Sequence, residues 1–247
     1  MINWRILRFY HFTPQPSQSM VDLNALSAAN AKRWANAKPT RKAEAANVAL
    51  RLYKARQRYR AVERLTGVPW PAIAVIHERE SSQQWNASLA QGDPWDRVSI
   101  HVPTGRGPFD SWETAAVDAL VKCPPFLAHH KDWSIAGTLT ALETYNGIGY
   151  AARAVPSPYL WSGTDQYRAG KYVRDGVYDP SKVDPQLGCA ALLMALTELD
   201  PNISFAGAKI AKSSASADPA RPSLTNPSKG SIGAFVVNLI RAISGRK

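Results

Sequence analysis

A mainly α-helical fold is predicted by three features of this 247-residue sequence. From Ala45 to Val62, apolar residues recur at alternating spacings of three and four, which is the period of one face of a helix. Residues that commonly begin helices precede several later apolar segments. Alternating apolar and polar residues, typical of strands, are nearly absent. Long loops are therefore expected at 83–110 and 147–183, and loops of that length are often functional.

The first expected elements are an arm and one basic helix. Residues 1–20 combine two prolines with several Ser and Gln residues, which predicts a poorly ordered arm. In the basic helical region 21–66, the apolar face leaves Arg51, Lys54 and Arg58 on the solvent side of the helix.

The central segment 67–200 is predicted to hold the remaining helices. Gly67 and Pro69 end the basic helix, and Pro71 fits the first turn of a helix that runs to about Ser81. Further helix starts are expected at Ser111 before residues 112–121, at Asp132 or Ser134 before 135–144, and at Asp184-Pro185 before 186–199.

The C-terminal flank divides into two parts. Residues 201–231 are rich in Ala, Ser and Pro and predict a linker. Residues 232–247 place Phe235, Leu239 and Ile243 on one side of a short basic amphipathic helix. This helix is expected either to bind an anionic membrane or lipopolysaccharide, or to dock on the protein's own core.

The net charge of +11 is concentrated in the two flanks, whereas 66–200 holds more acidic than basic residues. Basic flanks attract polyanions of any kind, and because no nucleic-acid-binding motif is recognisable, no specific nucleic acid is expected. Cys123 and Cys189 lack the spacing of a metal site and are expected to be free buried thiols. We expect a monomer without metal or cofactor. No transmembrane run and no export signal are evident, which predicts synthesis in the cytoplasm.

Two short motifs carry the functional signal. The first is Ile76-His77-Glu78-Arg79-Glu80-Ser81-Ser82, and the second is Ala141-Leu142-Glu143-Thr144-Tyr145-Asn146-Gly147. An acid followed by Ser at a helix end, with a Tyr-Asn-Gly turn some sixty residues on, resembles the catalytic core of goose-type lysozymes and soluble lytic transglycosylases. The Gly-Asp-Pro and His-Val-Pro-x-Gly-Arg segments between the motifs resemble a divergent branch of lysozyme-like proteins seen among phage endolysins.

The resemblance implies a lysozyme-like helical domain at 67–200 with long cleft-forming loops. It also implies cleavage of the β-1,4 bond between N-acetylmuramic acid and N-acetylglucosamine in peptidoglycan strands. The protein would then be bacterial or phage-encoded, and it would act on the cell wall.

The acid that protonates the leaving oxygen is expected to be Glu80. Helical spacing alone leaves two stripes open, one through Ile73 and Ile76 to Glu80 and another through Val75 to Glu78. The resemblance selects Glu80, because in that family the catalytic acid directly precedes Ser, here Ser81. The alternative reading is a helix-end carboxylate in a surface ion pair with Arg79.

Asp93 and Glu143 are the candidates for a second catalytic carboxyl. An inverting hydrolase needs one to orient water at roughly 6.5–9.5 Å from the acid. By the resemblance, a transglycosylase needs none, because the muramyl 6-hydroxyl is the nucleophile. Asp93 can equally hold an Asx-turn, and Glu143 can equally form a structural salt bridge. For His101 we expect a hydrogen bond within its loop.

Substrate binding is expected from residues around these carboxyls. The resemblance assigns Tyr145 and Asn146 to the cleft, although Asn-Gly also suits a helix C-cap. Aromatic side chains bind sugar faces well, and the tyrosine-rich stretch offers Tyr150, Tyr159 and Trp161 for glycan contact or for loop anchoring.

Other classes of function remain open from sequence. One is a noncatalytic glycan- or polyanion-binding protein on a lysozyme-like scaffold. Another is a hydrolase of the chitinase or chitosanase type, because such enzymes share the wider lysozyme architecture.

Overall fold

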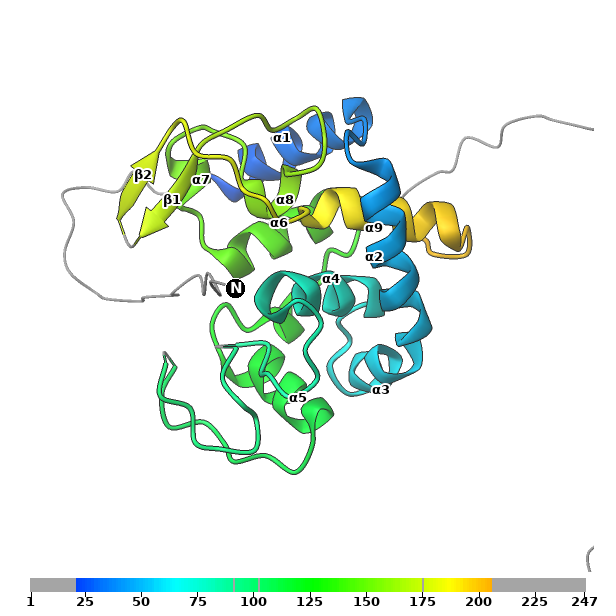
Figure 1. The fold of residues 1–247 in the computed structure, drawn as a ribbon, viewed down its shortest axis with the longest axis vertical. Coiled ribbons are helices and arrows are strands. Elements are labelled where there is room, and N and C mark those ends of the chain that lie inside the picture. Colours follow the sequence, from blue (N-terminus) through cyan, green and yellow to red (C-terminus); the bar gives the residue numbers. More distant parts are fainter. Residues whose placement is uncertain (1–20, 91, 102, 175, 206–247) are drawn as a thin grey trace, which may run out of the picture. The chain divides into compact units, whose positions relative to one another are not determined.

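The structure, a computed structural model, describes residues 21–205 apart from residues 91, 102 and 175. This part of the chain is mainly α-helical, as predicted, with one small two-stranded sheet (Figure 1). None of its helices is long and apolar enough to cross a membrane. The predicted arm, nearly all of the linker and the C-terminal helix lie outside the described residues.

The elements follow one another along the chain, and a single 3-10 turn (Leu127–His129) separates two of the helices. They are α1 (Leu23–Asn36), α2 (Lys42–Lys54), α3 (Arg56–Thr66), α4 (Trp70–Ser81), α5 (Trp112–Lys122), α6 (Ile135–Asn146), α7 (Gly149–Ala152), α8 (Pro158–Trp161), β1 (Lys171–Arg174), β2 (Val177–Asp179) and α9 (Cys189–Leu199).

The basic helix expected from Ala45 onward is two helices, α2 and α3, that meet at Ala55. The break lets α2 pack against α9 while α3 packs against α4 and α5. The spacing of apolar residues did not reveal it, because one non-helical residue leaves the three-and-four pattern unchanged. As predicted, α3 ends at Gly67, which takes the left-handed conformation (φ 72°) that glycine adopts without strain.

Helix α4 contacts α2, α3, α6 and α9 (Figure 1). Its start near Pro71 and its end at Ser81 agree with the sequence prediction. Residues 70–77 and Arg79 are all buried. A helix that is apolar on every side belongs in a core. The two stripes that lead to Glu78 and to Glu80 therefore do not differ in burial along this part of α4.

Local capping fixes two of the later helices. Ser111 accepts a hydrogen bond from the Thr114 N–H at the start of α5, and Ser134 accepts one from the Gly137 N–H at the start of α6, as predicted. Helix α9 instead begins at Cys189, three residues later than expected. The expected loop 147–183 contains α7, α8 and the antiparallel β1–β2 hairpin, none of which was predicted.

His77 lies at the centre of an aromatic cluster behind the end of α4. Its Nε2–H donates to the Gln84 carbonyl at 3.0 Å, and Nδ1 accepts from the Tyr59 hydroxyl at 3.0 Å. The rings of Trp85 and Trp112 lie 4.6 Å from its own, centroid to centroid. Burial lowers the pKa of His77 to about 4, so the imidazole is neutral in the folded protein.

This burial predicts an acid-sensitive fold. Below pH 6.5 His77 binds a proton in the unfolded chain but stays neutral in the folded protein. The free energy of unfolding therefore falls between pH 6.5 and about 4, by ~3 kcal/mol in all. Denaturant unfolding at pH 7, 5.5 and 4 should show this loss, and a His77→Gln variant should lack it. The two proteins share every other titrating group, so identical pH dependence in both would contradict the assignment.

Candidate functional site

Glu80 stands one residue before the end of α4, where it receives a hydrogen bond from a buried tyrosine. The Tyr159 hydroxyl, on α8, donates to Glu80 Oε1 at 3.0 Å. Tyr159 is 2% exposed, whereas Glu80 is partly exposed. Tyr159 thus holds the Glu80 carboxyl from the protein side, while the residue stays partly exposed.

A buried ion pair lies behind Tyr159. The Arg79 guanidinium is 4.9 Å from the Tyr159 ring centroid, and its Nη2 donates to Asp184 Oδ2 at 2.9 Å. Burial disfavours the charge on Asp184, but Arg79, with help from Lys171 at 3.4 Å, outweighs it and holds the pKa of Asp184 below its usual value. The pair fastens the segment before α9 to α4.

The loop after α8 joins the same segment. The Ser162 hydroxyl donates to the Asp184 carbonyl at 3.0 Å, and the Gly188 N–H donates to the Ser162 carbonyl at 2.7 Å. A Cβ at Gly188 would lie 2.3 Å from the Leu160 carbonyl oxygen, so only glycine permits this approach. The late start of α9 follows from these contacts, because Asp184 binds Arg79 and does not cap the helix.

The loop after α4 passes close to Glu80. Gly92 has φ 68°, and a Cβ built on it would lie 3.5 Å from the Glu80 carbonyl oxygen. The Tyr145 hydroxyl, from the end of α6, donates to the Leu89 carbonyl at 3.1 Å. This loop therefore connects the ends of the two sequence motifs, although Tyr145 itself is only 1% exposed.

Asp93 holds this loop together. Its Oδ1 accepts from His101 Nδ1 at 2.5 Å, and its Oδ2 accepts the N–H groups of Ile100 and His101 at 3.1 and 3.0 Å. Burial disfavours ionisation, but these hydrogen bonds outweigh it and lower the pKa of Asp93. A carboxylate so engaged is a loop anchor and a weak base.

Glu143 is 2% exposed and belongs to the contact between α6 and α1. Asn30 Nδ2 donates to its Oε2 at 3.1 Å. Burial raises the pKa of Glu143, and the Asn30 hydrogen bond only partly opposes this. The environment is that of a structural carboxyl between two helices.

The remaining candidates take different places. The Ser81 hydroxyl donates back to the His77 carbonyl at 3.1 Å, and Asn146 is half-buried at the end of α6. Tyr150 accepts from the Tyr172 N–H at 3.1 Å and supports the hairpin. Trp161 is completely buried in the core, a position from which it does not reach a ligand.

The sequence reasoning missed Asp184 and treated Arg79 only as a surface partner of the nearby glutamates. Arg79 stands between Glu78 and Glu80 at the polar end of α4, so its burial could not be inferred from its neighbours in the sequence. Both cysteines are free and buried, as expected, and burial raises the pKa of Cys189 to about 12, so its thiol is inert.

No protein-family model, curated protein or solved structure matches this chain. Within the described ranges, no group of three or more His, Cys, Asp or Glu residues is arranged to hold a metal ion.

Proposed function

We propose that this protein is a peptidoglycan-cleaving glycosidase of the lysozyme-like type, with Glu80 as the general acid. The observation that carries the proposal is the Tyr159 hydrogen bond to Glu80 at the end of a buried helix. The order of the Glu80-Ser81 and Tyr145-Asn146 motifs supports it, since both meet the loop that passes Glu80. An endolysin-type role at the cell wall accords with this order of motifs.

In this proposal the chemistry at the glycosidic oxygen is proton donation. The leaving oxygen needs a proton, and a carboxyl at a partly exposed helix end can deliver one. Tyr159 fixes the orientation of the carboxyl through Oε1. The buried ion pair of Arg79 and Asp184 supports Tyr159 from behind and keeps α8 in place.

The environments of the other two carboxyls favour transglycosylation over hydrolysis. Both carboxylate oxygens of Asp93 accept hydrogen bonds from its own loop, and Glu143 is buried and hydrogen-bonded to Asn30. An inverting hydrolase needs a second carboxylate to activate water. In attack by the muramyl 6-hydroxyl on C1, the Glu80 carboxylate that has just protonated the leaving oxygen takes the hydroxyl proton, so no second carboxyl is needed. The expected product therefore ends in a 1,6-anhydro sugar.

Digestion of purified peptidoglycan, followed by mass spectrometry of the fragments, tests both steps. We expect muropeptides with 1,6-anhydromuramic ends. Reducing ends would retain the glycosidase and overturn the transglycosylase route. Glycan strands left intact by the folded wild-type protein would overturn the proposed function.

A further inference from the structure

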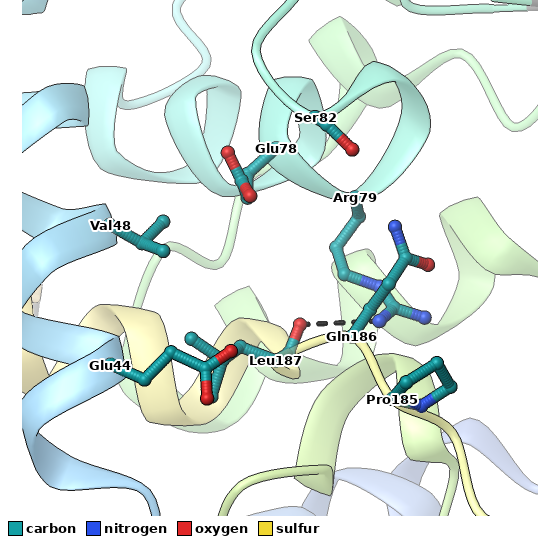
Figure 2. A pocket seen from close by; sticks show the side chains of 8 residues that line it. All are labelled: Glu44, Val48, Glu78, Arg79, Ser82, Pro185, Gln186 and Leu187. Atoms are coloured by element: carbon teal, nitrogen blue, oxygen red, sulfur yellow. Dashed lines mark hydrogen bonds between the residues drawn. The ribbon is translucent and has the colours of Figure 1, made fainter. Parts of the chain in front are cut away.

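A pocket that Glu80 does not line lies where α2, the end of α4 and the segment before α9 meet (Figure 2). Its volume is about 210 Å³, which is about seven times the volume of a water molecule in the liquid. Its lining residues are Glu44, Val48, Glu78, Arg79, Ser82, Pro185, Gln186 and Leu187. Glu78 precedes Glu80 by two residues, or about 200° around the helix, so the two carboxyls point to different sides of α4.

Glu78 brings an unsatisfied acceptor to this pocket. Its Oε2 atom is buried and accepts no hydrogen bond from any residue the structure describes. Arg51 Nη2 approaches to 3.7 Å, beyond hydrogen-bond distance, and the Arg51 side chain is 55% exposed. A buried carboxylate oxygen without a hydrogen bond is costly, and a ligand donor would satisfy it.

Arg79 brings an unsatisfied donor. Figure 2 shows its side chain crossing from α4 toward Leu187, whose carbonyl accepts from Nη1 at 3.2 Å. Nη2 is occupied by Asp184, but the Nε–H has no partner within the described part of the chain. The Arg79 side chain is 1% exposed, so an acceptor on a ligand in the pocket would relieve a fully buried group.

The other lining residues indicate what kind of ligand would lie between Glu78 and Arg79. Glu44 adds a second carboxylate, which already forms an ion pair with Arg41. The C-terminal end of α4, which is the negative end of the helix dipole, is capped at Ser82 and favours a cation. Val48, Pro185 and Leu187 provide apolar walls that suit an aliphatic chain.

We propose that this pocket binds a primary ammonium group joined by a short aliphatic chain to a carbonyl oxygen, as in a lysine-like residue. The ammonium donates to Glu78 Oε2 and displaces Arg51, while the carbonyl accepts from Arg79 Nε–H. The inference is independent of the proposed glycosidase activity.

Calorimetric titration of the full chain with 6-aminohexanamide tests the site, because this compound has the nitrogen-to-carbonyl spacing of lysine. Hexylamine lacks the carbonyl and hexanamide lacks the ammonium, so each should bind at least tenfold more weakly. Glu78→Gln should weaken 6-aminohexanamide binding at least tenfold. Glu198→Gln, a change at an exposed carboxylate outside the pocket, should leave it unchanged. Arg51→Gln should strengthen binding, because it removes the competing cation.

Absence of saturable binding, or equal binding by the wild type and a folded Glu78→Gln variant, would overturn the proposal. Equal binding of hexylamine would overturn the role of the Arg79 donor. Nα-acetyl-lysine amide distinguishes a lysine within a peptide from a free amine. Binding at least as tight as that of 6-aminohexanamide supports a peptide-borne amine, and weaker binding supports a free amine.

Discussion

Glu80→Gln is expected to lower the rate of cell-wall cleavage by roughly 10²–10⁴-fold, the usual contribution of a general acid. The amide has the shape of the carboxyl but cannot give up a proton to the leaving oxygen. Tyr159 can still donate to the amide oxygen, so the end of α4 should keep its structure. Clearing of purified cell walls, with unfolding curves for both proteins, measures the two properties separately.

Glu143→Gln is the matched control for this experiment. Its amide oxygen can still accept from Asn30, and burial already favours an uncharged group at this position. We therefore expect near wild-type cleavage. An equal loss of cleavage in both variants would contradict the assignment of Glu80 as catalytic and Glu143 as structural. Retained cleavage in Glu80→Gln would exclude Glu80 as the acid.

Helix ends were predictable from sequence because their causes are local. A serine side chain that accepts a hydrogen bond from an N–H three residues on, as at Ser111 and Ser134, needs no information from the rest of the fold. The positive φ at Gly67 is likewise a property of one residue. In each of these cases the sequence pattern and the structure agree.

Features set by distant contacts were not predictable in this way. Asp184 has the sequence context of a helix start, but Arg79, 105 residues earlier, requires its carboxylate. The interruption at Ala55 lets α2 and α3 pack against different helices, which the spacing of apolar residues does not reveal. Both features involve contacts between segments that are far apart in the sequence.

The candidate site shows the same division. Tyr159 and Trp161 are two residues apart in one aromatic stretch, and the sequence alone makes both candidates for glycan contact. The fold turns Tyr159 to Glu80 and buries Trp161 in the core. Only the path of the chain through α8 separates a residue that donates a hydrogen bond to Glu80 from one that fills space in the core.

The largest stability effect is expected from Asp184→Asn. This change preserves the shape of the side chain but leaves Arg79, which is 1% exposed, as a buried charge without its counterion. Removing one partner of a buried ion pair costs roughly 3–5 kcal/mol. For a domain of this size such a loss lowers Tm by about 10 °C or more. Urea unfolding gives the free energy directly.

Arg79→Met combined with Asp184→Asn separates the loss of the ion pair from the burial of an unpaired charge. The double variant contains no unpaired buried guanidinium. Its loss of unfolding free energy should therefore be about 2 kcal/mol smaller than the sum of the losses in the two single variants. Strict additivity would show that the two side chains do not interact energetically. Because Arg79 also lies under the Tyr159 ring, the unfolding cycle should be run beside the cleavage assay. If the double variant regains stability but not cleavage, the ion pair positions Tyr159 in addition to stabilising the fold.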